Sequence, residues 1–340
     1  MTLLAPSPLI VNGRPRLGQF SDSLRTINHR DFTLETPFGK AAGPLSQWLG
    51  FKQFQYFGGM SDTLVFGCAL AHLRHMAVAF VYVVDMRTGE LFSRSYRTPL
   101  GLGMSLSENP VDGSSHLRLP GVDIRMGYKA QPRRKSLYVK LGNFLEIDAD
   151  MPEADFEPMS ICTRTAYTGW VYANKTAGLD INGTLRFQGQ SHDLGQIGAM
   201  GHHDYSCGYM RRETYWNWAC FSGISPDGHR LGLNLSCGVN ETSFTENCLW
   251  VDGRLIKVNL TRFEFDQHNM MSPWRVCSDD GSVDLRFTPS GMHRETIDIK
   301  LMASNFKQLF GRFDGRLHVD GADIQVKGLS GFVEDQYVKW

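Results

Sequence analysis

The sequence predicts an all-β fold of antiparallel strands that close into barrels or sandwiches. Three observations predict this fold. The 340 residues include 35 glycines and are 11% aromatic, a composition typical of many strands joined by tight turns. Strand-like runs recur at even spacing in the second half, separated by Asp-Gly turns such as 252–253 and 320–321. No stretch shows sustained helical periodicity.

The first half begins with a loop-rich segment, residues 1–45, and an aromatic stretch, 46–60, that fits a helix or a strand equally well. The most apolar window, 63–86, is long enough to cross a membrane. However, two histidines and an arginine at its centre would be costly in lipid. We therefore expect two buried strands joined by a turn at 72–75, and no stable membrane insertion.

Residues 105–121, rich in Ser, Pro and Gly, are predicted to form a hairpin loop, and 135–148 alternates as a strand does. Acidic residues and prolines gather in 150–165, where we place a domain boundary. It divides the chain into an N-terminal β-domain, 1–160, and a C-terminal β-domain, 161–340, because the chain exceeds the length that one core usually supports. Further strands are expected near 168–173, 182–188, 201–222, 229–239, 241–250, 254–266, 282–287, 293–303, 308–319 and 322–337.

Charge and motif content exclude several classes of function. Lys+Arg and Asp+Glu both number 35, so the net charge gives no case for binding nucleic acid or an anionic membrane. No glycine-rich phosphate loop and no GxSxG elbow is present, and we expect no cofactor. The seven cysteines are odd in number and form no CxxC pair, and the N-terminus lacks the features of a signal peptide. These features predict reduced thiols and a cytoplasmic location.

The stretch 199–223, AMGHHDYSCGYMRRETYWNWACFSG, concentrates histidine, aspartate, arginine and tryptophan more than any other. Two strand-like runs carry it, 201–212 and 214–222. Side chains two apart on a strand share a face. The expected faces are His203, Tyr205 and Arg211 on one side of the first run, His202, Asp204 and Arg212 on the other, and Trp216 with Trp218 on one face of the second run.

Asp204 is the candidate catalytic acid or base. A carboxyl in an aromatic-walled cavity can have a shifted pKa and can protonate an alkene or carbonyl group. The residues expected to assist or position it are His202, His203, Arg211 and Arg212. The residues expected to line the pocket and stabilise a developing cation are Tyr205, Tyr209, Trp216 and Trp218. The alternative is a buried structural ion pair between Asp204 and one of the arginines.

Three further polar residues, Glu241, Glu246 and Asn247, lie between strand-like runs. Such residues often belong to turns. Glu241 directly follows an apolar run, however, so we expect it to point into the cavity toward the arginines, and Asn247 to contact substrate. The last ten residues, 331–340, are predicted to form a terminal strand that closes the sheet. The alternative is that Glu334, Asp335 and Lys339 reach back to the arginines.

Metal binding is an alternative use of the histidines. Two histidines and a carboxylate can hold a metal ion. Adjacent residues on a strand point to opposite faces, so His202 and His203 cannot both reach one ion in regular geometry. His202 with Asp204 would need a third ligand, for which the candidates are His192, His229 and Glu241.

Several of these motifs together resemble the bacterial family known as domain of unknown function 2804. The resemblance rests on segments 169–185, 201–223, 229–253, 272–289 and 331–340, of which GHHDYSCGYMRRETYWNWACFSG and GFVEDQYVKW are examples. That family is related to the AttH and hydroxyneurosporene synthase group, which includes carotenoid 1,2-hydratase, and more loosely to tocopherol cyclase and lipocalin-like Diels–Alderases. The resemblance implies two lipocalin-like β-domains packed together, with an apolar ligand cavity near their interface. It implies no particular reaction.

We therefore expect a cofactor-independent acid/base enzyme of the hydratase, dehydratase, cyclase or isomerase type, acting on a hydrophobic, unsaturated small molecule. A protein that binds lipid or another hydrophobic ligand without chemistry is the first alternative. A metal-dependent enzyme that uses His and Asp ligands is the second. The oligomeric state is left open.

Overall fold

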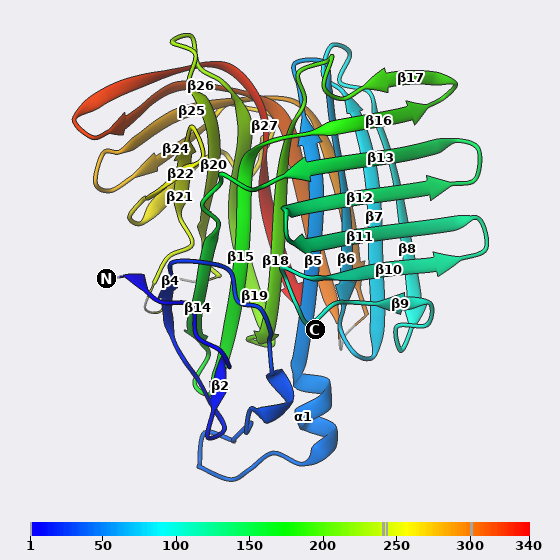
Figure 1. Ribbon diagram of the computed structural model, residues 1–340, viewed down its shortest axis with the longest axis vertical. Coiled ribbons are helices and arrows are strands. Elements are labelled where there is room, and N and C mark those ends of the chain that lie inside the picture. The colour runs from blue at the N-terminus through cyan, green and yellow to red at the C-terminus, as the bar shows by residue number, and fades with distance from the viewer. Residues whose placement is uncertain (1, 240–241, 243, 300–301) are drawn as a thin grey trace.

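The computed structural model describes residues 2–239, 242, 244–299 and 302–340. Its strands form three large antiparallel sheets, with one short parallel pair between β1 and β4. We call them the central sheet, the seven-stranded sheet and the C-terminal sheet (Figure 1). One α-helix, α1 (Pro44–Gly50), one 3-10 helix, η1 (His29–Asp31), and a short hairpin of β2 (Ile10–Val11) with β3 (Arg14–Pro15) complete the described elements.

The strands of the seven-stranded sheet follow one another in chain order, whereas those of the central and C-terminal sheets do not. From edge to edge, the central sheet contains β1 (Thr2–Leu3), β4 (Gly18–Phe20), β14 (Met159–Thr165), β15 (Gly169–Asp180), β18 (Met200–Tyr209), β5 (Phe51–Met60), β6 (Leu64–His72), β7 (Met76–Asp85) and β8 (Leu91–Pro99). The seven-stranded sheet contains β17 (Gln190–Asp193), β16 (Asn182–Phe187), β13 (Leu145–Pro152), β12 (Arg133–Leu141), β11 (Val122–Ala130), β10 (Gly113–Leu119) and β9 (Met104–Ser105). The C-terminal sheet contains β22 (Arg254–Lys257), β21 (Cys248–Val251), β20 (Arg230–Cys237), β19 (Glu213–Ile224), β27 (Ala322–Lys339), β26 (Ala303–Val319), β25 (Val283–Asp298), β24 (Trp274–Ser278) and β23 (Thr261–Glu264).

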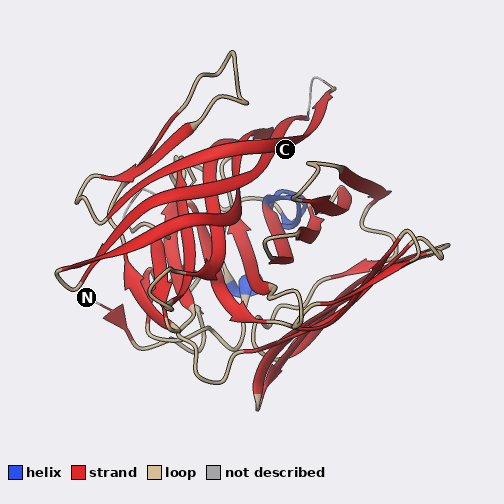
Figure 2. Cartoon of the chain, turned by 90° about the horizontal axis from the view of Figure 1, so that it is seen from above, coloured by secondary structure: helices blue, strands red, loops and turns tan. Residues whose placement is uncertain are grey.

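The central sheet lies between the other two (Figure 2). On one face Phe57 packs against Tyr128 of the seven-stranded sheet, with 5.6 Å between the ring centroids. On the other face Tyr82 packs against Phe310 of the C-terminal sheet, at 4.9 Å. Because both faces are covered, β5, β6, β15 and β18 are buried along almost their whole length. The all-β, lipocalin-like sandwich predicted from the sequence is confirmed.

Most predicted strands are confirmed, and the differences lie mainly at their ends. The apolar window 63–86 forms β6 and β7 with a turn at 73–75, as expected. The stretch 46–60, which fitted either element, contains both, because α1 passes directly into β5. The prediction of a loop over 105–121 is wrong in its second half, where β10 pairs with β11. No disulfide joins the seven cysteines, and no helix among the described residues has the length and apolar character needed to span a membrane.

The sheet pairings cross the boundary predicted between residues 160 and 161. Strand β14 spans that point and β15 and β18 follow it, yet all three belong to the central sheet with β5–β8. In contrast, the sheets change completely between β18 and β19, at residues 210–212. If the described chain is divided once into two β-units, only a division at residues 210–212 leaves every sheet within one unit.

Two glycines paired across β5 and β6 make room for a buried chain of polar groups. Gly58 lies opposite Gly67 in the register. The hydroxyls of Tyr56 and Tyr82 are hydrogen-bonded at 2.5 Å, and the Tyr56 hydroxyl is 3.0 Å from Nε2 of His202. A Cβ at Gly67 would lie 2.6 Å from both hydroxyls. Side-chain packing therefore requires glycine at this position.

We predict that Gly67→Ala destabilises the protein by about 1–3 kcal/mol, because the added methyl group forces the two tyrosines apart. Gly43→Ala is the matched control, since a Cβ at Gly43 meets nothing within 4 Å. Denaturant unfolding of both variants measures the effect. Equal stability of the two variants would contradict the proposed packing role.

Candidate active site

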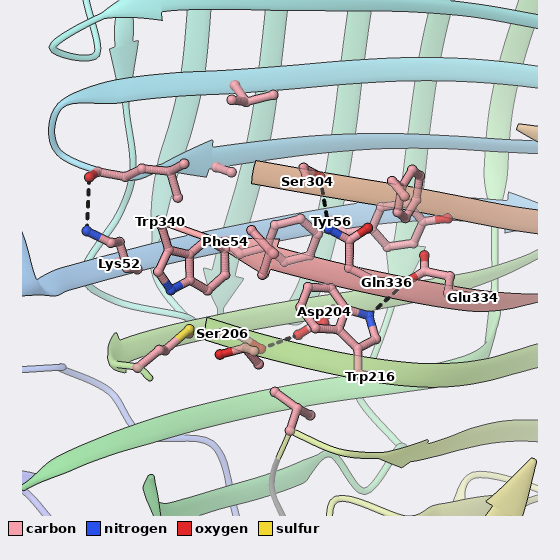
Figure 3. Close-up of a pocket in the computed structure, with 18 of the residues that line it drawn as sticks. Lys52, Phe54, Tyr56, Asp204, Ser206, Trp216, Ser304, Glu334, Gln336 and Trp340 are labelled. Atoms are coloured by element: carbon pink, nitrogen blue, oxygen red, sulfur yellow. Dashed lines mark hydrogen bonds between the residues drawn. The ribbon is translucent and has the colours of Figure 1, made fainter. Parts of the chain in front are cut away.

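A cavity of about 230 Å³ lies between the central and C-terminal sheets. Figure 3 shows its lining, which comes mainly from β5, β7 and β18 on one side and β19, β26 and β27 on the other. Most of the lining side chains are apolar, among them Phe54, Val78, Phe80, Val171, Phe306 and Val338. The cavity is therefore suited to a hydrophobic molecule.

The two ends of the cavity differ in chemistry and exposure. Asp204 and Glu334 line one end and are each only 5% exposed, so we call this the inner end. Met76, Met210 and Trp340 line the other end and are half-buried, so this end lies nearer to solvent. The carboxyl groups of Asp204 and Glu334 thus lie at the deep end of an apolar space, where their interactions are weakly screened.

The alternation of side chains along β18 determines what reaches the cavity. Asp204 and Ser206 line it on the face turned toward the C-terminal sheet. His203 faces the other way, with its ring centroid 4.6 Å from that of Phe57 and its Nε2 3.4 Å from the hydroxyl of Tyr128. His203 and Asp204 thus lie on opposite faces of β18, as the alternation predicted.

Asp204 is paired with Lys175, which lies directly opposite it on β15. The ammonium of Lys175 is 3.2 Å from Asp204 Oδ2 and 2.6 Å from Glu246 Oε1. The Ser206 hydroxyl donates to Asp204 Oδ1 at 2.7 Å. The side chains of Lys175, Asp204 and Glu246 are at most 7% exposed. One buried ammonium group is therefore shared by two carboxyl groups.

This sharing has opposite consequences for the cation and the acid. Burial alone would lower the pKa of Lys175, but Asp204 and Glu246 raise it above its usual value, so the lysine stays charged. Burial raises the pKa of Asp204, and the charge of Glu246 raises it further, while Lys175 and Ser206 act in the opposite direction. Asp204 therefore binds a proton more readily than an exposed aspartate does.

Glu334 on β27 is a third carboxyl group at the inner end. It accepts hydrogen bonds from Trp216 Nε1 at 3.1 Å and from Gln308 Nε2 at 2.8 Å. Burial raises the pKa of Glu334 to about 7, and the charge of Asp204 adds to this, although Trp216, Gln308 and Lys175 act against it. A carboxyl group with a pKa near neutrality is suited to general acid or base catalysis.

His202 reaches the cavity only through Tyr56, which lines it. Burial lowers the pKa of His202 to about 3, so its imidazole is neutral at ordinary pH. Its Nε2 contacts the Tyr56 hydroxyl, and its buried Nδ1 has no hydrogen-bond partner among the described residues. His202 is therefore placed to orient Tyr56 rather than to donate a proton as an imidazolium.

The two tryptophans expected to line the pocket do so, but in different ways. Trp218 Nε1 donates to Asn234 Oδ1 at 2.7 Å, and the ammonium of Lys175 lies 4.6 Å from the Trp218 ring centroid. This cation already occupies one face of the Trp218 ring. Trp216 is half-buried and lines the cavity beside Glu334, to which its indole N–H donates a hydrogen bond.

The structure corrects the predicted ion pair of Asp204. Its partner is Lys175, not Arg211 or Arg212, because β18 ends at Tyr209 and its alternation does not extend to the arginines. Arg211 donates to the Gly238 carbonyl at 2.7 Å. Arg212 is exposed, and its carbonyl accepts from the backbone N–H of Trp340 at 3.1 Å.

Three other predicted contacts also lie outside the cavity lining. Tyr205 faces the seven-stranded sheet side, and its hydroxyl donates to the Ser107 carbonyl at 2.9 Å. Tyr209 accepts from Gln47 at 2.9 Å beneath the N-terminal segment. Asn247 is fully buried and accepts from the backbone N–H of Ser236. Each hydroxyl or amide is used within the fold. Glu241 lies outside the described residues.

Sequence reasoning did not single out Lys175 or Tyr56, and for Glu334 it weighed only a terminal strand against a contact with the arginines. A signal for Lys175 was present, since a lysine inside the run GWVYANKTAG of a buried strand must find a partner. The signal for Glu334 was weaker, because the charged or polar residues Asp335 and Gln336 follow it directly. The terminal segment 331–340 forms the end of β27, which pairs with β19 and β26 inside the sheet.

Among the described residues, no three His, Cys, Asp or Glu side chains gather as metal ligands would. His229 pairs with Asp252 at 2.8 Å, and His192 lies on β17 in the seven-stranded sheet. Neither candidate lies beside His202 and Asp204 in the central sheet, so the part of the chain that is described gives no support to the metal hypothesis.

Several solved structures resemble this protein in fold over most of the length of the chain. CghA is 10% identical, with a TM-score of 0.57, over 84% of this chain and 87% of its own. A protein of Nitrosomonas europaea described as AttH is 13% identical, with a TM-score of 0.50, over 85% of this chain and 92% of its own. Kievitone hydratase of Nectria haematococca is 9% identical, with a TM-score of 0.50, over 84% of this chain and 88% of its own. Identities this low show the fold alone.

None of the curated proteins compared with the chain matches it. A family model matches residues 12–340, nearly the whole sequence, and confirms the assignment that the motifs suggested. The chain belongs to the family described as Domain of unknown function (DUF2804).

Proposed function

We propose that this protein is an acid/base enzyme acting on a hydrophobic, unsaturated small molecule in the cavity. The observation that carries the proposal is the inner end of the cavity, where the described residues place three carboxyl groups, those of Asp204, Glu246 and Glu334, around the ammonium of Lys175. Burial raises the pKa of Asp204 and brings the pKa of Glu334 to about 7, so Glu334 is partly protonated near neutral pH. Protons held beside an apolar space are available to an alkene or carbonyl group.

Glu334 and Asp204 have environments that suit different roles. Glu334 is bonded to neutral donors and has a pKa near neutrality, so we assign it as the general acid. Asp204 contacts Lys175 and Ser206, which stabilise its carboxylate form, so we assign it as the general base. Two carboxyl groups whose surroundings favour opposite protonation states are typical of acid/base sites.

Hydration illustrates the proposed chemistry. Glu334 transfers its proton to one alkene carbon, and water adds to the other as Asp204 accepts a proton from that water. The π bond breaks, one C–H and one C–O bond form, and the proton lost by Glu334 is balanced by the one gained by Asp204. Dehydration is the reverse, whereas isomerisation and cyclisation begin with the same protonation.

Trp216 is the residue we assign to stabilise positive charge on the substrate. It lines the cavity next to the proposed acid, and an indole ring attracts a cation through its π face. Trp218 contributes less to this role, since Lys175 already lies over its ring. Kievitone hydratase, which shares the fold, is a hydratase by its name, and this supports hydration or dehydration as the reaction class to test first.

The alternative of a non-catalytic binding protein needs only the apolar walls. Native mass spectrometry of the freshly purified protein would identify a co-purified ligand, which both hypotheses predict. Incubation of that ligand with the protein in D₂O then separates them. An enzyme that protonates carbon incorporates deuterium at carbon, whereas a carrier releases its ligand unchanged.

We predict that Glu334→Gln and Asp204→Asn each slow this deuterium incorporation by about 10²- to 10⁴-fold, because each removes one partner of the proton transfer. The matched control is Asp335→Asn. Asp335 neighbours Glu334 but pairs with Lys307 at 2.7 Å and does not line the cavity. Incorporation at the wild-type rate in both site variants would refute the assignment.

We also predict that Glu334 makes stability depend on pH. Its pKa is raised from 4.5 to about 7, so between these values the folded chain keeps a proton that the unfolded chain has lost. The free energy of unfolding contributed by this group is fully present below the lower value and is lost as pH rises through about 7. Relative to Glu334→Gln, the wild type should lose about 3 kcal/mol across this window. Urea unfolding at several pH values measures the difference, and parallel curves for the two proteins would contradict the raised pKa.

A further inference from the structure

The end of the cavity nearer to solvent carries a lysine that the proposed reaction does not use. Alternate residues Lys52, Phe54 and Tyr56 of β5 line the cavity, and Tyr56 lies opposite Asp204 in the register. Lys52 is four residues from Tyr56, which corresponds to about 13 Å along a strand. Figure 3 shows Lys52 beside Trp340 at one end, with Glu334 toward the other.

Lys52 is a buried cation without a counter-charge among the described residues. It is only 8% exposed. Its ammonium donates to the carbonyl oxygens of Leu49 and, at 3.2 Å, Leu73. An ammonium has three donors, so one remains for a ligand. No described carboxylate lies within ion-pair distance of Lys52, although ion pairs are frequent elsewhere in the described chain, from Arg14–Glu35 to Lys339–Glu213.

The surroundings of Lys52 are positive as well as buried. Burial, with a further contribution from the charges of Arg74 and Arg212, lowers the pKa of Lys52 to about 8. Arg74 lies in the turn between β6 and β7, and Arg212 follows β18. Keeping an ammonium in such a place is costly unless a negative group arrives to compensate it. An anion bound at Lys52 would gain from all three cations.

We propose that the ligand of this cavity is amphipathic, with a carboxylate or similar anionic head group bound by Lys52 and an apolar, unsaturated body extending toward Asp204 and Glu334. This inference rests on the proposed function for the reacting end of the molecule, but the binding of the head group can be tested alone. The apolar residues between the two ends, including Phe54, Val338 and Phe306, would contact the body. Because the distance between Lys52 and Glu334 is fixed by the fold, the same segment of the ligand would always lie beside the carboxyl group of Glu334.

Calorimetric titration with simple amphiphiles tests the head-group site. The probes are decanoate, 1-decanol and decyltrimethylammonium, which share an alkyl chain and differ in charge. The wild type should bind decanoate about 10- to 100-fold more tightly than 1-decanol, because a hydrogen bond to a charged group is added, and should bind the cationic probe most weakly. Equal affinity for decanoate and 1-decanol would overturn the proposal without any variant.

Three substitutions localise the effect. Lys52→Met should remove the preference for decanoate while leaving 1-decanol affinity within about twofold, and Lys52→Arg should retain the preference because the positive charge remains. Lys129→Met is the matched control, since Lys129 is exposed on β11 of the seven-stranded sheet. An unchanged preference in a folded Lys52→Met variant, judged by its melting temperature, would refute the site.

The test of the anion site at Lys52 is independent of the test of the catalytic assignment. Glu334→Gln should keep the wild-type preference for decanoate, because Glu334 lies at the opposite end of the cavity. Preference for decanoate without deuterium incorporation into any co-purified ligand would support the anion site and remove the catalytic assignment. Deuterium incorporation without a preference for decanoate would support the catalytic assignment and refute the anion site.

Discussion

The site depends on one buried ammonium group shared by carboxyl groups between two sheets. Lys175 pairs with Asp204 and Glu246 and lies over the ring of Trp218. Removing a charge partner from such a cluster is far more costly than removing it from the surface, because water cannot replace it. The same low dielectric raises the pKa of Asp204 and of Glu334. Stability and proposed chemistry therefore rest on the same contacts.

Strand register brings these groups together. In the central sheet Lys175, Asp204 and Tyr56 are directly opposite one another on three adjacent strands. In the C-terminal sheet Trp218, Glu334 and Gln308 form the corresponding row. The two rows are joined across the gap by Lys175 over Trp218, and by Tyr56, whose ring centroid is 5.9 Å from that of Trp218. Each sheet thus contributes one proposed proton-transfer group, so the chemistry requires both sheets to pack correctly.

Local patterns in the sequence predicted the fold better than they predicted the partners within the site. Alternation along 201–209 correctly separated Asp204 from His203, since the period of a strand is a local property. The same reasoning wrongly carried the alternation past Tyr209 to the arginines, because no local signal marked the end of the strand. The pairing of Asp204 with Lys175 depends on which strands become neighbours, and that was not visible in one sequence. The three-layer arrangement was missed for the same reason.

Infrared spectroscopy detects whether a buried carboxyl group at the inner end of the cavity holds a proton. A protonated carboxyl group shows a C=O stretching band that its carboxylate form lacks. We expect the folded wild type to show such a band at about pH 5, to lose it as pH rises through about 7, and to lack this transition in Glu334→Gln. A wild type whose buried carboxyl groups are all ionised at about pH 5 would contradict the account.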